Sequence, residues 1–388
     1  MQGILERVVD GLQERYNRVP HEGRATLALK TDDGPLRLFG QGEPAATLVV
    51  RNQAGMRALA SMDLTAVAEA YVRNDLDVEG DLMQVLPLRT SFSDKHPLQF
   101  LMRFVKPLLR GQVAADRDAV PAHYDRSDDF YLSFLDTRHR CYSHGFFAHP
   151  DESLEDAVSR KLQFALDSVG AKPGDRILDI GGGWGAMTEF AGQRGIHVTS
   201  ITISEVSRSF ITRLIESQKL PCEVRMEHFF EHVPAQPYDA IVNLGVTEHL
   251  PDYARTLAHY DRLLKAGGKV YLDASASRQR WEISTFLEKH IYRGNGRLLC
   301  LHEYLEAIST SVFEAEMVIN DRVNYGLTAR HWALNLERNR ARAEAGGGSE
   351  GYRLFKLYLW GCVDGFERDL VQAYHLVLSR PPVRGKTY

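Results

Sequence analysis

Three glycines, Gly181, Gly183 and Gly185, follow an apolar run that ends at Asp179 and precede an alanine-rich amphipathic stretch. Glycines after a strand allow a sharp turn and let a ligand approach the backbone, and the next helix offers free N–H groups. The pattern predicts a nucleotide-binding turn. Its D-x-G-x-G-x-G spacing differs from the G-x-G-x-x-G of dinucleotide-binding dehydrogenases. The next strand ends near Thr202, without the acid that a nicotinamide site places about 20 residues on.

The elements that must position this turn alternate along the chain from residue 160 onward. Apolar runs typical of buried strands are "RILDIGG", "HVTSITIS", "CEVRMEH", "YDAIVNLG" and "GGKVYLDAS". Helical patterns follow, notably at 205–218 and 252–264. Alternating apolar strands and helices indicate a parallel sheet with helices on both faces. The expected fold class is therefore α/β, a doubly wound, mostly parallel Rossmann-like sheet with helical additions.

The N-terminal part of the chain has a different pattern. Residues 1–20 have helical periodicity, residues 24–52 alternate as strands do, and a helix is expected at 63–74. These elements predict a small N-terminal α+β domain over residues 1–95.

Two further segments complete the expected organisation. Residues 96–120 mix apolar side chains with lysines and arginines, which is typical of an amphipathic connecting helix or of a membrane-surface patch. The main domain is expected over residues 121–388. Within it, "RNRARAEAGGGSEG" (338–351) has the composition of a linker.

Composition narrows the choice of partners and compartment. Lysine and arginine number 47 against 51 aspartate and glutamate residues, a net charge of −4, so we expect no nucleic-acid partner. Uncharged runs are too short to span a bilayer, and the N-terminus has charges at helical spacing where a signal peptide is apolar. The four cysteines are far apart and lack zinc spacing, so we expect a cytoplasmic, metal-free protein.

Motifs around the sheet resemble those of known enzymes. The segment "LLKAGGKVYL" (263–272) is similar to the one before the fifth strand of class I S-adenosylmethionine-dependent methyltransferases. Other matching segments lie in order along the chain: "AEAYVRNDLDVEGDL" (68–82), "HYDRSDDFYLSFLD" (123–136), "YSHGFF" (142–147), "VNLGVTEHL" (242–250), "FLEKHIYRGN" (286–295), "NYGLTARHWALNL" (324–336) and "FERDLVQAYHLVLSR" (366–380). Over nearly its whole length the chain resembles the cyclopropane-fatty-acyl-phospholipid synthase family, in its long form with an N-terminal accessory module.

The resemblance implies a cofactor and a substrate. The cofactor is S-adenosylmethionine, whose one-carbon unit is transferred to the C=C bond of unsaturated acyl chains in membrane phospholipids. Such a substrate implies peripheral contact with the anionic inner face of the membrane, and a homodimer is left open. The residues that should contact the cofactor are Tyr124, Tyr142, Ser143, Asp179, Gly181, Gly183, Thr202 and Phe229. Phe229 takes the position that covers the adenine, and Asp179 either binds the cofactor's ammonium or orders the loop.

The family's catalytic shell is only partly matched. The family holds a bicarbonate ion that removes a proton from the newly added methyl group, with a Cys, a Glu, a His and a Tyr among its ligands. Glu248 and Tyr325 match the Glu and the Tyr, but His144 stands at the Cys position and Asp273 at the His position. Two carboxylates would repel an anion unless a protonated His144 lies between them.

Two outcomes of the reaction follow from these departures. In one, His144 compensates Asp273, and bicarbonate or Asp273 serves as the base that closes a cyclopropane. In the other, which we slightly favour, the cation loses a different proton or undergoes a hydride shift and gives a methylated chain. A methyltransferase for a soluble small molecule is a second alternative, since it would share the core.

Overall fold

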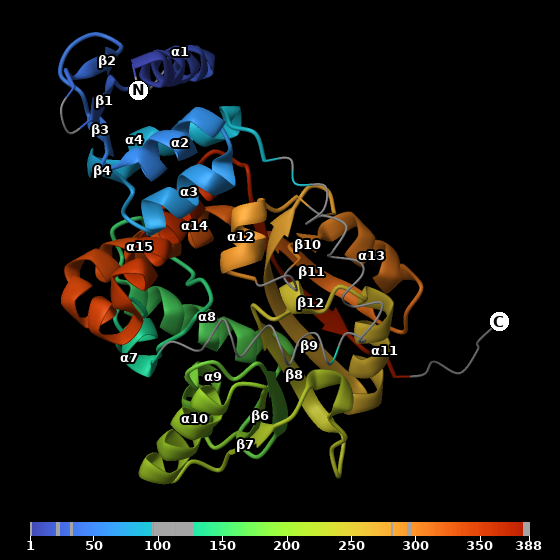
Figure 1. Ribbon diagram of the computed structural model, residues 1–388. Coiled ribbons are helices and arrows are strands. Elements are labelled where there is room, and N and C mark those ends of the chain that lie inside the picture. Colours follow the sequence, from blue (N-terminus) through green and yellow to red (C-terminus); the bar gives the residue numbers. More distant parts are fainter. Residues whose placement is uncertain are drawn as a thin grey trace.

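The computed structural model describes residues 2–20, 24–31, 34–94, 96, 113, 127–280, 282–292 and 297–382 (Figure 1). Tyr124 and nearly all of the expected connecting segment 96–120 lie outside the described residues. In the described part of the chain, every helix is too short or too polar to traverse a bilayer.

The larger sheet confirms the expected α/β class. Its strand order is β11-β12-β9-β8-β5-β6-β7, with β10 paired to β9. The strands are β5 (Arg176–Ile180), β6 (His197–Thr202), β7 (Glu223–Met226), β8 (Tyr238–Leu244), β9 (Leu264–Ser277), β10 (Leu299–Cys300), β11 (Glu314–Asn320) and β12 (Gln372–Ser379). All neighbours pair in parallel except β12, which runs antiparallel to both β9 and β11.

Helices cover both faces of this sheet. On one face α8 packs in a core that includes Ile177, Val242 and Tyr271, and on the other α11 and α13 pack near Leu178 and Leu272. Alternate residues of one strand thus pack into the cores on opposite faces of the sheet, because successive side chains of a strand point to opposite faces. The helices of this part are α7 (Asp128–Tyr131), α8 (Leu154–Val169), α9 (Ala186–Gly192), α10 (Glu205–Gln218), η2 (Phe229–Glu231), η3 (Thr247–His249), α11 (Tyr253–Leu263), α12 (Thr285–His290), α13 (Leu301–Ser309), α14 (Arg322–Arg338) and α15 (Arg340–Glu367).

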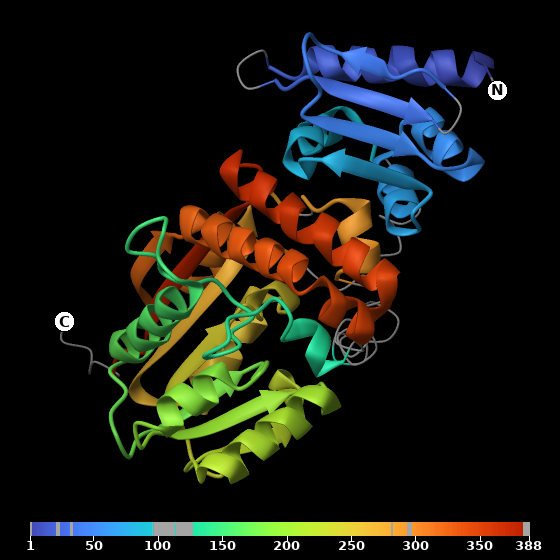
Figure 2. The ribbon, with the colours of Figure 1, turned by 90° about the vertical axis from the view of Figure 1, so that its left-hand side faces the viewer.

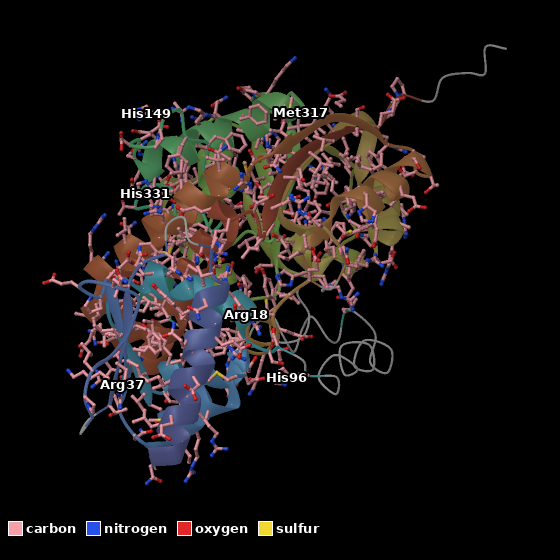
Figure 3. The ribbon with its side chains drawn as sticks, turned by 90° about the horizontal axis from the view of Figure 1, so that it is seen from above. Arg18, Arg37, His96, His149, Met317 and His331 are labelled. Carbon is pink, nitrogen blue, oxygen red and sulfur yellow. The ribbon has the colours of Figure 1, made fainter. Side chains whose placement is uncertain are left out.

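The N-terminal residues form a second, four-stranded sheet of order β2-β1-β3-β4. Its core contains Val8 and Leu12 of the first helix, as the helical spacing of residues 1–20 predicts, and Leu27, Leu29 and Leu48 of the strands. The elements are α1 (Gln2–Arg18), β1 (Leu27–Thr31), β2 (Arg37–Phe39), β3 (Ala46–Val50), α2 (Gln53–Ser61), α3 (Leu64–Val72), β4 (Leu76–Gly80), α4 (Leu82–Val85) and η1 (Leu86–Ser91). In Figure 3, Arg37 of this sheet lies far from Met317 of the larger sheet.

The linker expected at 338–351 is wrong. The segment is helical, with one kink at Gly348, where φ is 71° and ψ is 169°. Gly346 and Gly347 lie against Phe130, where a side chain would clash, so packing overrides the low helix propensity of the glycines.

Helix α15 also joins the two sheets. In Figure 2, α14 and α15 lie between the N-terminal elements and the larger sheet. Arg353 of α15 donates hydrogen bonds to the carbonyl oxygens of Tyr71 (2.6 Å) and Leu76 (2.8 Å). Its side chain is thus one anchor between α15 and the N-terminal module, and Arg89 of η1, which donates to the carbonyl oxygen of Gly361 at 3.0 Å, is another.

Candidate active site

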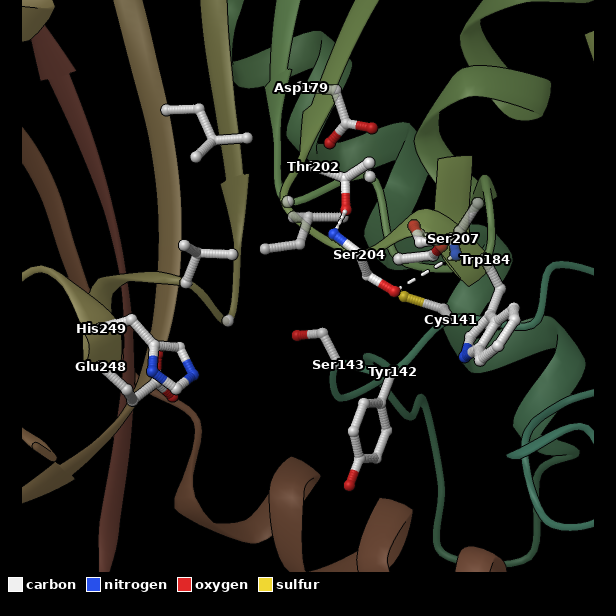
Figure 4. A pocket seen from close by; sticks show the side chains of 18 of the residues that line it. Cys141, Tyr142, Ser143, Asp179, Trp184, Thr202, Ser204, Ser207, Glu248 and His249 are labelled. Atoms are coloured by element: carbon white, nitrogen blue, oxygen red, sulfur yellow. Dashed lines mark hydrogen bonds between the residues drawn. The ribbon is translucent and has the colours of Figure 1, made fainter. Parts of the chain in front are cut away.

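A pocket opens at the carboxyl ends of β5, β6 and β8 (Figure 4). Strands β6 and β8 pair with opposite edges of β5, so the order in which strands are added to the sheet reverses there. Open α/β sheets bind ligands at such a switch point. The predicted site residues that line the pocket are Tyr142, Ser143, Asp179, Gly181, Gly183, Thr202, Phe229, Glu248 and Tyr325.

The glycine turn forms one wall of the pocket. Gly181 has a φ of +75°, and a Cβ there would lie 2.3 Å from Val246 Cγ2. Gly183 has a φ of +53°, and among the described residues a Cβ there would meet only the Gly181 carbonyl oxygen, at 3.7 Å. The free space beside Gly183 is therefore pocket, and a cofactor can approach the backbone there. This cradle fits S-adenosylmethionine.

Hydroxyl groups of the neighbouring strand and helix hold the turn in place. Ser207 Oγ donates to the carbonyl oxygen of Gly183 at 2.6 Å, and Ser204 Oγ accepts from the Ser207 N–H at 3.3 Å. Thr202 Oγ1 accepts from the Ser204 N–H at 3.1 Å. Ser207 therefore supports the turn.

Asp179 faces its neighbouring strand. It is buried, and its Oδ2 accepts a hydrogen bond from Ser200 Oγ at 2.7 Å. Burial raises the pKa of Asp179 to about 6, although the Ser200 hydrogen bond and the charge of Lys161 oppose this. The contact with Ser200 favours the loop-ordering role of the two that the sequence left open.

Aromatic rings line the opposite wall. The Tyr142 ring lies 5.4 Å from that of Trp332 and 5.7 Å from that of Tyr131, measured between centroids. Phe229 packs on His259 at 4.7 Å, near the end of β6. The sequence reasoning missed several lining residues, namely Trp184, Ser204, His249, Tyr292, Trp332 and Tyr358. Trp332 lies in the segment "NYGLTARHWALNL" (324–336), and the resemblance of that segment to the family was the signal that could have identified this residue.

Glu248 is the buried acid of this pocket. It lies in η3 directly after β8, and its Oε1 accepts a hydrogen bond from the Ser275 N–H at 2.7 Å. Among the described residues Oε2 has no hydrogen-bond partner. Burial raises the pKa of Glu248 to about 7, and the nearby charge of Asp273 adds to this. Burial thus brings the titration of Glu248 toward neutral pH.

Tyr325 comes from α14 and meets the same corner. Its ring lies between those of His144 and Phe366, each 4.8 Å away. Its side chain is hydrogen-bonded to Ser275, and burial together with the Glu248 charge raises its pKa well above the ordinary value. Tyr325 is therefore a neutral phenol in this site.

Compensation of Asp273 by His144, one of the two alternatives that the sequence left open, is not what the structure has. Asp273 Oδ2 lies 2.9 Å from the ammonium of Lys161, and both side chains are fully buried. His144 Nε2 instead lies 3.1 Å from Asp321 Oδ2, which His375 also contacts. Asp273 and His144 thus each have a partner, Lys161 and Asp321 respectively, that lies far away in the sequence.

The structure therefore does not build the expected bicarbonate site. Neither His144 nor Asp273 is among the residues that line the pocket. Their side chains are committed to Asp321 and Lys161, so two of the expected ligands face elsewhere.

The sheet order, the glycine turn and the pocket at the switch point define the class of S-adenosylmethionine-dependent methyltransferases. A crystal structure of mycolic acid cyclopropane synthase CmaA1 complexed with SAH and CTAB is similar, with a TM-score of 0.62 and 28% identity over 67% of this chain and 96% of that one. Residues 112–376 match the family described as mycolic acid cyclopropane synthetase, and the chain belongs to this family.

Curated relatives give the same picture. Sphingolipid C9-methyltransferase B of Emericella nidulans is 27% identical over 81% of this chain, which spans 64% of that relative's length. A probable fatty acid methyltransferase of Pseudomonas putida is 26% identical over 92% of this chain and 93% of its own.

Proposed function

We propose that the protein transfers a one-carbon unit from S-adenosylmethionine to the C=C bond of unsaturated acyl chains in membrane phospholipids. The methylated acyl chain is the favoured product. The observation that carries the proposal is the shape of the pocket. The Gly183 cradle opens toward a wall formed by Tyr142, Tyr325 and Trp332, with the single free carboxyl oxygen of Glu248 beside it.

The residues of this chain have separate tasks in the reaction. We assign cofactor binding to Tyr142, Ser143, Gly181, Gly183 and Thr202, with Phe229 covering the adenine. The bound cofactor supplies an electrophilic methyl group on a sulfonium. An alkene is a weak nucleophile, so the pocket must align it closely and exclude water. The aromatic rings stabilise the cation that remains on the acyl chain after transfer.

The choice of product depends on which base lies near that cation. Ring closure needs a base beside the newly added methyl group. His144 and Asp273 are paired with Asp321 and Lys161, so neither is available for that proton. Loss of a proton from an acyl-chain carbon next to the cation, taken up by the Glu248 carboxylate, instead leaves a methylated, unsaturated product. The relative from Pseudomonas putida, named as a probable fatty acid methyltransferase, supports this choice.

Cyclopropane formation is the second candidate, and one observation favours it. Among the described residues the second carboxyl oxygen of Glu248 has no hydrogen-bond partner, and burial raises the pKa of this group to about 7, so its ionised form is accessible near neutral pH. A carboxylate in this position can remove the methyl proton directly. The family description and the resemblance to CmaA1 support this candidate.

The experiment that tests the function is lipid analysis. The protein is expressed in a host that lacks its own synthase, and acyl chains are analysed by mass spectrometry before and after hydrogenation. We expect a gain of one CH₂ unit that becomes a branched saturated chain on hydrogenation. A gain that resists hydrogenation shows the cyclopropane instead. No gain in lipids, with methyl transfer to a polar acceptor, contradicts the proposal and identifies a small-molecule methyltransferase.

A matched pair of glycine variants controls this experiment. Gly183→Ala adds a methyl group inside the cradle and should abolish the mass gain. Gly174→Ala places alanine at a φ of +91°, where a Cβ meets nothing within 4 Å, and so carries backbone strain without blocking the pocket. We expect Gly174→Ala to retain the product. Equal loss in both variants would mean that strain alone explains the result.

A further inference from the structure

A buried chain of polar groups runs from α8 to the pocket. Lys161 lies on the face of α8 that packs on the larger sheet, and its ammonium lies 2.9 Å from Asp273 Oδ2 on β9. The other carboxylate oxygen, Oδ1, accepts a hydrogen bond from Ser143 Oγ at 2.7 Å. Ser143 lines the pocket and lies between Tyr142 and Glu248 in Figure 4. Lys161 is thus connected to the cofactor site through one intervening carboxylate.

Lys161 and Asp273 form a pair of opposite formal charge inside the protein. Lys161 and Asp273 are both fully buried, and a buried charge without a partner costs several kcal/mol. Burial alone would lower the pKa of Lys161, but the Asp273 carboxylate outweighs this and raises it. The titratable groups that face the pair from neighbouring elements are Cys141, Asp179, Tyr271, Glu248, Tyr325 and Asp321, the last in contact with His144 and His375.

The Lys161–Asp273 pair determines whether the Ser143 hydroxyl donates or accepts a hydrogen bond on its pocket side. A serine hydroxyl has one proton to donate and two lone pairs that accept. Because the proton of Ser143 goes to Asp273, its oxygen is left as an acceptor on the pocket side. The ammonium and sulfonium groups of S-adenosylmethionine are cationic, so an acceptor suits them and a donor does not.

We propose that Lys161 is a positioning residue for the cofactor: its ammonium holds the Asp273 side chain, and Asp273 in turn fixes the Ser143 hydroxyl as an acceptor toward the bound cofactor. Lys161 itself does not touch the cofactor. The proposal rests on the proposed function, because it takes S-adenosylmethionine as the ligand of the pocket.

Calorimetric binding of S-adenosylhomocysteine and sinefungin tests the proposal without turnover. Affinities are measured from about pH 5.5 to about pH 8.5, a range that brackets neutral pH, for the wild type, Lys161→Met and the double variant Lys161→Met/Asp273→Asn. Lys161→Met leaves the Asp273 side chain buried without its cationic partner, a situation that favours the neutral form of a carboxyl group as the pH falls. Its affinity relative to the wild type should then fall by at most about tenfold per pH unit and recover as the pH rises.

The double variant and a surface variant are the controls. Position 273 of the double variant cannot ionise, so its affinity relative to the wild type should stay constant across the pH range. Lys172→Met removes an exposed lysine and should match the wild type. A merely structural role for Lys161 would lower stability in Lys161→Met without changing the pH dependence of ligand affinity.

Different outcomes overturn different statements. If the wild type binds neither ligand, the proposed function fails. If the wild type binds both and the ratio of Lys161→Met to wild type does not change with pH, the role of Lys161 alone is refuted. If Lys161→Met does not fold, a cycle of Ser143→Ala and Asp273→Asn decides. The two changes should be non-additive in ligand affinity because they act through one hydrogen bond, and additivity refutes the proposal.

Discussion

Glu248 shows how burial alone gives an ordinary residue an unusual property. It is 4% exposed, and one of its oxygens has no hydrogen-bond partner among the described residues. Its pKa rises from 4.5 to about 7, chiefly because burial penalises the charged form. The protein therefore holds a carboxyl group that changes charge near neutral pH, at the place where a cation is expected to form.

The raised pKa of Glu248 predicts a pH-dependent effect of its removal. The folded state binds this proton more tightly than the unfolded state, so the stability that the proton gives is complete below about pH 4.5 and is lost as the pH rises through about 7. Glu248→Gln cannot lose that proton. Relative to the wild type, it should gain up to about 3 kcal/mol in free energy of unfolding between those pH values.

Urea unfolding of both proteins at several pH values measures this difference. A constant difference across the range would show that Glu248 titrates normally. The same variant should lose lipid product, because Glu248 takes up the proton in both candidate reactions.

At the scale of elements, the sequence reasoning was most successful where periodicity is strong. The helix expected at 205–218 coincides with α10 (Glu205–Gln218), four of the five expected strands each contain a strand of the larger sheet, and the fifth, "GGKVYLDAS", lies within β9. The linker expected at 338–351 failed because three glycines were weighed by propensity. In the structure Gly346 and Gly347 allow α15 to pack on Phe130, and Gly348 is the kink, where a Cβ would meet nothing within 4 Å.

The candidate site was predictable in part for a similar reason. Nine of the twelve predicted residues line one pocket, because the carboxyl ends of parallel strands meet at one edge of a sheet. The partners of Asp273 and His144 were not predictable. Lys161 lies on a helix 112 positions before Asp273, and nothing in the spacing indicates that the two side chains meet.

The glycines of α15 give a prediction at this scale. A Cβ at Gly347 would lie 2.5 Å from Phe130 Cδ2, so Gly347→Ala should cost about 1–3 kcal/mol of unfolding free energy through overpacking. Gly361→Ala lies on the same helix, where a Cβ would lie 3.4 Å from Nη1 of Arg89, at ordinary contact distance. It should be neutral or gain up to about 1 kcal/mol from helix propensity. Urea unfolding distinguishes them, and equal effects would contradict the packing argument.

At the scale of the whole molecule, a lipid substrate requires contact with a membrane. Residues 95–110, nearly all outside the described part, carry apolar side chains together with Lys95, Arg103, Lys106 and Arg110. A segment of this composition is suited to lie on an anionic surface. We propose that it is the site of peripheral membrane contact.

Vesicle sedimentation tests this contact. The wild type should bind vesicles that contain phosphatidylglycerol, and binding should weaken as salt rises because charge attraction is screened within about 10 Å at 0.1 M salt. A variant with Lys95, Arg103, Lys106 and Arg110 changed to glutamine should bind less. A control with Arg7 and Arg57 of the N-terminal module changed to glutamine should bind as the wild type does. Binding that is absent or indifferent to salt contradicts the proposal.

The Arg353 anchor between α15 and the N-terminal module can form only late in the synthesis of the chain. Arg353 follows its acceptor Tyr71 by 282 positions. At a translation rate of about 5–20 residues per second, roughly 15 to 60 seconds pass before the anchor exists. During that interval the N-terminal module is outside the ribosome with its docking face open to water and to other nascent chains. Its own core around Val8, Leu12 and Leu29 must hold it folded until the last long helix arrives.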